Sequence, residues 1–185
     1  NDNNGVSNPG NAYLSDNSRA EFDNSSDRVD YTFGSIVPAG ATITGIEVRL
    51  EASRSGSSSR SFNVSLINGE STTSSRSTGT LGGSDTNYDL GGSSDLWGLS
   101  WSASQINTIE VRVQASSGSG TIRLDRIQIR VTYSATPTYK VTYNAGGAPG
   151  SAPTDNADYE EGDSVTVKDA MSWPGHAFDG WSNGS

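Results

Sequence analysis

Apolar and polar residues alternate with a period of two through much of residues 11–134, and this pattern predicts β-strands. The longest example covers residues 104–134, where only the polar segment 116–120 interrupts it. We interpret this stretch as one long β-hairpin, around which the other strands are organised. The residues expected to point inward from it are Ile109, Val111, Val113, Ala115, Ile122, Leu124, Ile127, Ile129, Val131 and Tyr133.

The apolar positions change phase in the second half of this stretch. Ile122 and Leu124 are at even positions, whereas Ile127 and Ile129 are at odd ones. One extra residue in a strand moves every later side chain to the opposite face of the sheet. The phase change therefore predicts a β-bulge at Asp125–Arg126.

The remaining strands are expected to cover the apolar face of the hairpin, because an isolated hairpin is only marginally stable. They are expected over residues 13–14, 20–22, 29–33, 41–53 and 62–66, and over 71–80 as an exposed edge strand anchored by Leu81, Tyr88 and Leu90. Ser102 is expected to cap a short helical turn. Roughly eight strands, with turns every 8–12 residues or so, predict an all-β fold, a jelly-roll-like antiparallel β-sandwich.

Charged side chains occupy the outward positions of the longest strands. Glu47, Arg49 and Glu51 lie on one strand, and the two glutamates are opposite in sign to Arg112, Arg123 and Arg130, so they would pair if these strands are neighbours. We interpret these charges as a cross-strand ladder that stabilises the sheet rather than as a binding patch.

The basic residues divide the chain into two segments. Residues 1–136 contain all ten arginines and 14 of the 21 acidic residues, and residues 137–185 contain both lysines and the other seven acids. This shift predicts two modules joined by a linker at 135–138. We therefore expect a flexible N-terminal arm, or an edge segment, over 1–10, a β-sandwich over 11–134 and a second module over 139–185.

Overall composition narrows the classes of partner. The net charge of −9 argues against nucleic acid, because phosphate groups would be repelled. The absence of cysteine excludes disulfide bonds and cysteine-ligated metals. The sequence has no apolar run of about 18 residues, so no membrane insertion is expected. It opens on a polar leader without a signal-peptide pattern, as expected of a processed chain or an excised fragment.

Three motifs in the first module carry a resemblance to a known family. They are IVPAGATITGIEV at 36–48, LGGSSDLWG at 90–98 and IQIRVTY at 127–133. Together they resemble a β-sandwich module of bacterial surface proteins and phage structural proteins. The resemblance covers residues 11–134 and implies an appended or stalk-forming module of a large extracellular protein. It supplies no catalytic residues.

Three further motifs carry a second resemblance. YKVTYNAGG at 139–147, YEEGDSVTV at 159–167 and GHAFDGW at 175–181 resemble the Listeria–Bacteroides repeat, the B-repeat of internalin-type surface proteins. That family implies a small β-grasp-like fold in exported, cell-wall-attached proteins, associated with adhesion and protein contacts.

The family's repeat continues beyond its FxGW motif, so residues 139–185 are expected to be an incomplete β-grasp-like repeat. Its core would lack part of its cover, either because the chain is a fragment or because an open edge pairs with a neighbouring molecule. The expected core residues are Tyr139, Val141, Tyr143, Val165, Val167, Phe178 and Trp181.

Candidate reaction chemistry is sparse. His176 is the only histidine, and we expect a surface or packing role rather than a Ser-His-Asp triad. Glu47 and Glu51 lie about 13 Å apart along one strand, which is too far for glycoside hydrolysis. We expect no catalytic residues, no metal ligands and no cofactor, and interpret the chain as non-enzymatic.

A bound calcium ion is the alternative to the expectation that the chain has no cofactor. Two aspartate triplets, Asp23, Asp27 and Asp30, and Asp85, Asp89 and Asp95, offer oxygen ligands. We interpret both triplets as solvated loop acids that cap turns, because neither follows the order of an EF-hand loop.

Aromatic residues are the candidates for sugar binding, since sugar-binding sandwiches use exposed rings. Trp101 and Tyr88 are the candidate ligand contacts, and Tyr13 is a further one. Trp101 is expected to be exposed and Trp97 to lie in the core.

The sequence thus favours a non-catalytic extracellular structural or adhesion module of a bacterial cell-surface protein. Its partners would be other surface proteins or glycans, and self-association would use an open edge of residues 139–185. The alternatives are a carbohydrate-binding module and a structural subunit of a virion or extracellular filament.

Overall fold

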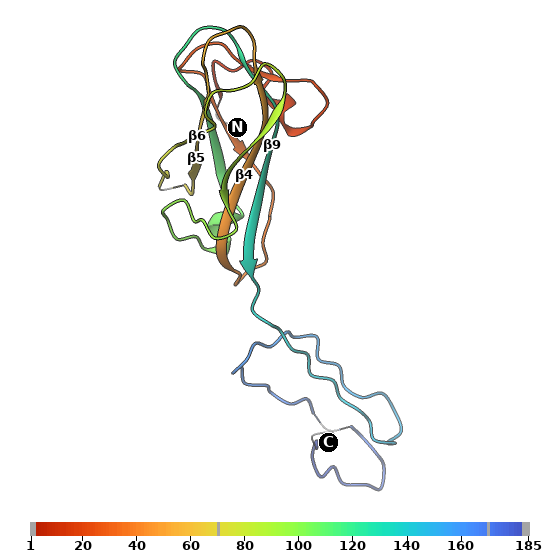
Figure 1. The fold of residues 1–185 in the computed structure, drawn as a ribbon. Helices are drawn as coiled ribbons and strands as arrows, with labels where there is room; N and C mark the ends of the chain where they lie inside the picture. The colour runs from red at the N-terminus through yellow and green to blue at the C-terminus, as the bar shows by residue number, and fades with distance from the viewer. Residues whose placement is uncertain (1–2, 70, 170, 183–185) are drawn as a thin grey trace. The chain divides into compact units, whose positions relative to one another are not determined.

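The computed structural model describes residues 3–69, 71–169 and 171–182. The chain divides into two compact units, residues 1–135 and 136–185, and this division falls at the start of the expected linker 135–138. Figure 1 shows strands in the first unit and an irregular path in the second. Expectations that concern residues 1–2 and 183–185 lie outside the described residues.

The first unit is an antiparallel β-sandwich with little helix (Figure 1). Its described strands form two sheets, of order β1-β3-β8-β5-β6 and β2-β9-β4-β7. The first sheet contains β1 (Asn3–Asn4), β3 (Arg28–Thr32), β8 (Glu110–Ala115), β5 (Phe62–Ile67) and β6 (Arg76–Ser77). The second contains β2 (Ala20–Phe22), β9 (Ile122–Ser134), β4 (Thr42–Arg54) and β7 (Thr86–Gly92). Two short helices, η1 (Pro9–Tyr13) and α1 (Ala103–Ile106), lie in the connections.

Strands β2 to β9 have the connectivity of a jelly roll. Consecutive strands lie in opposite sheets, except that β6 follows β5 in the same sheet. Two four-stranded sheets wound in this way form the double-sheet jelly roll, and β1 adds a short edge beside β3. The expected all-β, jelly-roll-like sandwich is confirmed.

The interpretation of residues 104–134 as one hairpin is wrong. β8 pairs with β3 and β5, whereas β9 pairs with β2 and β4 in the other sheet. The apolar rows of β8 and β9 therefore lie in opposite layers around one core. Alternation shows which face of a strand is apolar, but it does not show which strand is its neighbour.

The core lies between the two sheets, and its composition follows the predicted alternation. Ile109, Val111 and Val113 are completely buried, as are Ile122 and Leu124. The row along β4 is buried as expected: Ile46, Val48, Leu50 and Ala52. Of the inward positions predicted near the end of β9, Tyr133 is 42% exposed, so that prediction is wrong.

The predicted β-bulge is confirmed. Glu51 of β4 lies opposite Arg126, and the next residue, Ala52, lies opposite Leu124. Asp125 is therefore the extra residue of β9, without a partner on β4. The bulge brings this acidic side chain to a buried position.

The expectation of a flexible arm over residues 1–10 is wrong for the described residues of that segment. Asn3 and Asn4 pair with β3, and Ser7 pairs with Glu21 of β2. Val6 is only 5% exposed. The segment is ordered mainly by backbone hydrogen bonds, which do not depend on the type of side chain. Its sequence can therefore be polar, with Val6 as its one apolar side chain in the core. The alternative of an edge segment agrees with β1 at the sheet edge.

Two local predictions agree with the structure. The exposed edge strand expected over 71–80 is present as the two-residue edge strand β6. Ser102 caps α1 through a capping box, in which its side chain accepts the backbone N–H of Gln105.

Ion pairs join neighbouring strands on the solvent face, and they agree in part with the predicted cross-strand ladder. Arg130 pairs with Glu47 at 2.7 Å, between β9 and β4. Arg49 pairs with Asp89 of β7 at 2.6 Å, and this contact lowers the pKa of Asp89. Two of the expected arginines have other partners, because Arg123 pairs with Glu21 on β2 and Arg112 lies in the opposite sheet.

The LGGSSDLWG motif anchors the end of β7 to β4. The ring N–H of Trp97 donates to the carbonyl of Ile46 at 3.0 Å, and the N–H of Ile46 donates to the carbonyl of Asp95 at 2.9 Å. Arg76 lies 4.2 Å from the centre of the Trp97 ring and also pairs with Asp95. Gly91 has a φ of +88°, and a Cβ atom there would lie 2.2 Å from the Ile46 oxygen. The motif is thus structural, and Trp97 lies in the core as expected.

The second unit is irregular in the described residues, 136–169 and 171–182. They contain one isolated bridge, Tyr139 to Tyr159, and no longer strand or helix. A β-grasp-like fold for this segment stays a prediction. Of its seven expected core residues, four are exposed: Tyr139, Val165, Val167 and Phe178.

Replacement of Gly91 tests the close packing at the Trp97 anchor. We expect Gly91→Ala to lower the free energy of unfolding by about 2–4 kcal/mol, from left-handed backbone strain plus overpacking. Gly92→Ala is the matched control, because a Cβ atom at Gly92 meets nothing within 4 Å. Chemical denaturation monitored by circular dichroism measures both variants, and equal losses of stability would contradict this account of the anchor.

Candidate functional site

The candidate ligand contacts in the first unit are largely occupied by structural roles. Trp101 is 7% exposed, and its ring N–H donates to the carbonyl of Leu96 at 2.8 Å. Tyr88 is half-buried, and its hydroxyl accepts the N–H of Gly82 at 2.8 Å. The expected exposure of Trp101 is therefore wrong, because the turn after Trp97 folds the ring back onto the core. A ligand role for Trp101 and Tyr88 stays a prediction, and the buried ring of Trp101 does not support it.

Tyr13 is more exposed than Trp101 and Tyr88, the other two candidate ligand contacts. Its ring is 37% exposed and packs edge-on against Tyr31, with ring centres 5.5 Å apart. Its hydroxyl donates to the carbonyl of Thr32 at 3.2 Å. A single ring held in this way fixes the segment after η1 and does not form a platform.

The first aspartate triplet is divided between two structural tasks. A carboxylate oxygen of Asp27 accepts the backbone N–H groups of Asp23 and Asn24, each at 2.8 Å. Asp30 forms a two-point ion pair with Arg112 at 2.6 and 2.7 Å. These carboxylates close a turn and link two strands.

Each member of the second triplet faces an arginine. Asp85 pairs with Arg19, Asp89 with Arg49 and Asp95 with Arg76. Arg76 and the N–H of Trp97 lower the pKa of Asp95. Within the described residues, no three acidic or histidine side chains come together as a metal-binding group. The two triplets of the sequence are thus separate contacts in the structure.

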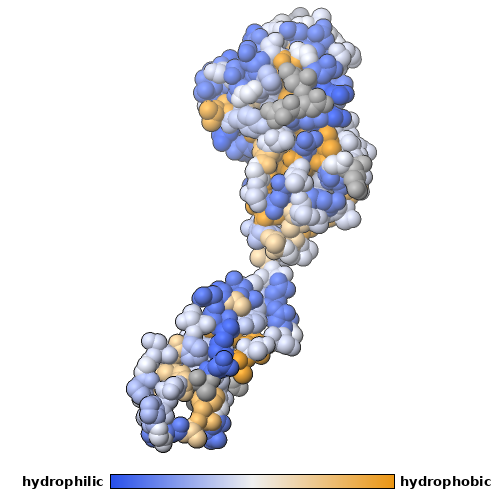
Figure 2. Space-filling view, turned by 180° about the vertical axis from the view of Figure 1, so that it is seen from behind, coloured by the Kyte–Doolittle hydropathy of each residue, from blue (hydrophilic) through white to orange (hydrophobic). Residues whose placement is uncertain are grey.

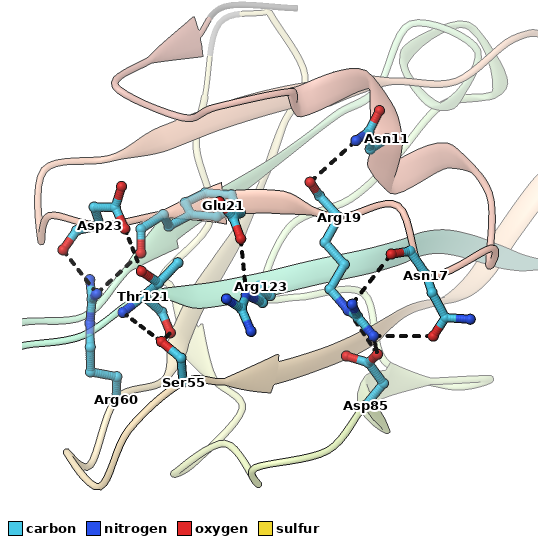
Figure 3. A network of polar contacts seen from close by, with 11 residues as sticks. Asn11, Asn17, Arg19, Glu21, Asp23, Ser55, Arg60, Asp85, Thr121 and Arg123 are labelled. Carbon is cyan, nitrogen blue, oxygen red and sulfur yellow. Dashed lines mark hydrogen bonds and ion pairs between the residues drawn. The ribbon is translucent and has the colours of Figure 1, made fainter.

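Polar side chains near β2 form a belt of separate contact groups, which Figure 3 shows from close by. At one end, Arg60 is 1% exposed and donates to the carbonyls of Phe22 and Asp23 at 3.1 and 3.0 Å. Arg123 and Glu21 pair in the middle, and Arg19 with Asp85 and Asn17 closes the other end. This belt joins β2 to the loops that flank it.

The second unit contains a hollow lined with aromatic rings. Its volume is about 730 Å³. The aromatic residues that line it are Tyr143, Trp173, His176, Phe178 and Trp181, beside Val141, Val167 and Met171. Trp173 and Phe178 are 40% and 47% exposed. Hydrophobic side chains of this unit reach the surface among hydrophilic ones in Figure 2.

Ring contacts and two hydrogen bonds hold this aromatic groove together. Trp181 lies 4.7 Å from Tyr143 and 5.3 Å from Phe178, between ring centres. The Trp181 ring N–H donates to the Lys168 carbonyl at 2.9 Å, and the Lys168 N–H donates to the Tyr143 hydroxyl at 2.9 Å. One side of the groove is thus fixed, while the exposed rings face solvent.

His176 lies at the groove, where its ring centre is 4.1 Å from that of Trp173. The sequence-based expectation of a surface or packing role agrees with this contact. Trp173 itself was not singled out from the sequence. The sequence signal nearest to it is the Pro174-Gly175 pair, which favours a turn at this position.

Comparisons with known proteins add little. No family model matches the sequence, and no curated protein matches it. Among solved structures, a chain of "Structure of infectious bursal disease virus Gt strain" is similar at 12% identity with a TM-score of 0.28. The match covers 63% of this chain and 34% of the viral chain, and a likeness this weak carries no argument. Among the described residues there is also no helix with the length and apolar character needed to cross a membrane.

A pair of tryptophan variants tests this assignment of a filled sandwich and an open groove. We expect Trp101→Ala to reduce the free energy of unfolding of the sandwich by about 3 kcal/mol, because it removes a buried ring. Trp173→Ala is expected to change it by less than about 0.5 kcal/mol. Urea denaturation followed by far-ultraviolet circular dichroism measures both. An effect of Trp173→Ala as large as that of Trp101→Ala would contradict the assignment.

Proposed function

We propose that this chain is a non-catalytic extracellular structural or adhesion module of a bacterial cell-surface protein. The sandwich is the rigid support, and the aromatic groove of residues 136–182 is the contact surface for another protein. The observation that carries the proposal is the groove itself, with Trp173 and Phe178 exposed beside the ordered rings of Tyr143 and Trp181. Exposed aromatic side chains in a hollow are typical anchors of protein interfaces.

The chemistry of the sandwich supports a non-catalytic role. Of the six loop aspartates singled out from the sequence, five bind arginines or backbone N–H groups, and Asp23 accepts the Thr121 hydroxyl. Carboxylates engaged in this way keep strands and turns together and are not poised for proton transfer. The resemblances of residues 11–134 and 139–185 to modules of exported proteins support the extracellular location and a protein partner.

A carbohydrate-binding module is the second candidate, favoured by the same exposed rings. Sugars stack on exposed aromatic faces, and the groove offers two of them, whereas Trp101 is buried. A virion or filament subunit is the third candidate. Its support is limited to the jelly-roll architecture, which capsid and lectin domains share.

Self-association is the first protein contact to test. We expect the chain to form oligomers with increasing concentration in light-scattering measurements, and Trp173→Ala combined with Phe178→Ala to abolish them. The matched control is Tyr133→Ala, which removes an exposed ring from the sandwich. Negative-stain microscopy then separates closed oligomers from filaments, which would favour the third candidate.

A monomer at all concentrations shifts the test to a glycan array. Glycan binding that depends on Trp173 would favour the carbohydrate-binding candidate over protein contact. Oligomers that persist in the double variant, or a monomer without glycan binding, would contradict the groove as the contact surface.

A further inference from the structure

The β-bulge of β9 places a carboxylate where the sandwich leaves it without a full set of partners. Asp125 is 2% exposed, and its Oδ1 atom has no hydrogen-bond partner among the described residues. The backbone N–H of Asn17 hydrogen-bonds to this carboxylate. A buried carboxylate oxygen without a partner costs free energy, so its presence calls for a second group.

A second carboxylate nearby has the same feature. Asp85 accepts two hydrogen bonds from Arg19, one of them at 2.9 Å from Nε, and both go to its Oδ2 atom. Its Oδ1 atom is buried and has no hydrogen-bond partner in the described part of the chain. The side chain of Asp85 is 13% exposed.

The backbone brings these two acids together. Asp85 immediately precedes β7, and Asp125 is the bulged residue of β9, so they flank β4 from its two sides. Ser53 of β4 hydrogen-bonds to Asp85. Asn17 links Asp125 to Arg19, the partner of Asp85, because its N–H contacts Asp125. Its carbonyl and side-chain oxygens accept hydrogen bonds from Arg19 (Figure 3). Asn17 adopts a left-handed φ of +64°, which marks a constrained turn.

The charges around the pair do not balance. Burial, then Asp85 and Glu51, raise the pKa of Asp125, and Arg19 only partly opposes them. Burial also disfavours the charged form of Asp85, but the hydrogen bonds from Arg19 and Ser53 outweigh it and lower its pKa. Arg123 acts on Asp85 from a distance while it pairs with Glu21. One more positive charge between Asp85 and Asp125 would stabilise both ionised forms.

We propose that Asp85 and Asp125 bind a calcium ion through their two unpartnered Oδ1 atoms, beneath the loop of residues 14–19. Calcium suits the site because it prefers oxygen ligands, and two carboxylates and the Ser53 hydroxyl supply them beside the Arg19 guanidinium. Water would complete the coordination. The bound ion would join β7, β9 and the loop across β4. This site differs from both aspartate triplets that the sequence suggested, although it shares Asp85 with one of them.

The test is calcium titration of the full chain after removal of divalent ions with a chelator. We expect isothermal titration calorimetry to report one calcium ion bound per chain, and saturating calcium to raise the melting temperature by several degrees. Asp125→Asn keeps the shape of the side chain but removes its charge, and we expect it to weaken calcium binding at least tenfold. Asp89→Asn is the matched control, because Asp89 is an exposed acid of the same sheet and should leave calcium binding unchanged.

The rival explanation is a proton shared between Asp85 and Asp125. A raised folded-state pKa at Asp125 means that stability falls as the pH rises through that pKa, and that it is greatest below the unfolded-state value. The absence of calcium binding near neutral pH would overturn the proposal, and a stability gain on acidification that Asp125→Asn abolishes would then support the shared proton. Calcium binding that Asp125→Asn retains, or that Asp89→Asn removes, would overturn it as well.

Discussion

The pairing of β4 with β9 is the interaction on which the rest of the sandwich depends. These two strands of 13 residues each form twelve residue pairs, with a register shift near each end. β7 joins the free side of β4, and β2 joins the free side of β9. Their inward rows form one wall of the core, against which the other sheet packs. A change that separated β4 from β9 would therefore remove both the sheet and the core.

The loops of the sandwich are held by polar contacts that act on this frame. Trp97 closes one corner through the Ile46 carbonyl, and Arg60 closes another through the carbonyls of Phe22 and Asp23. Arginine suits the second role because its guanidinium offers several donors in a fixed geometry. These contacts explain how a chain that is only 31% hydrophobic forms an ordered unit. The apolar residues are concentrated in one layer, while the outward positions carry hydroxyls and ion pairs.

Much of the sandwich could be predicted from the sequence, because a strand's alternation reports directly which residues are buried. The row along β4 and the bulge at Asp125 follow from that pattern alone. Strand partners could not be predicted in the same way, since residues 104–134 would show the same alternation in a hairpin or in two opposite sheets. The sequence left a flexible arm and an edge segment as alternatives for residues 1–10, because backbone pairing such as that of Asn3 and Asn4 leaves little trace in side-chain composition.

The candidate sites were harder to predict than the fold. Asp85 looked like a member of a loop triplet, but its partner Arg19 is 66 residues away in the sequence. The burial of Trp101 likewise depends on a turn whose path is set by Trp97. In the second unit, four aromatic residues were expected as core, yet Tyr139 and Phe178 are exposed because the described residues form a single bridge and no sheet. Such contacts depend on three-dimensional neighbours that no local pattern identifies.

The two units differ in rigidity: the sandwich is rigid around the β4–β9 pair, whereas the second unit, the proposed contact surface, is open. Amide hydrogen exchange of the full chain, measured by nuclear magnetic resonance, tests this difference most directly. We expect the slowest exchange in the paired centres of β4 and β9, faster exchange in the edge strands β1 and β6, and little protection in residues 136–182. Protection of residues 136–182 equal to that of β4 and β9, or exchange in β4 and β9 as fast as in the edge strands, would contradict it.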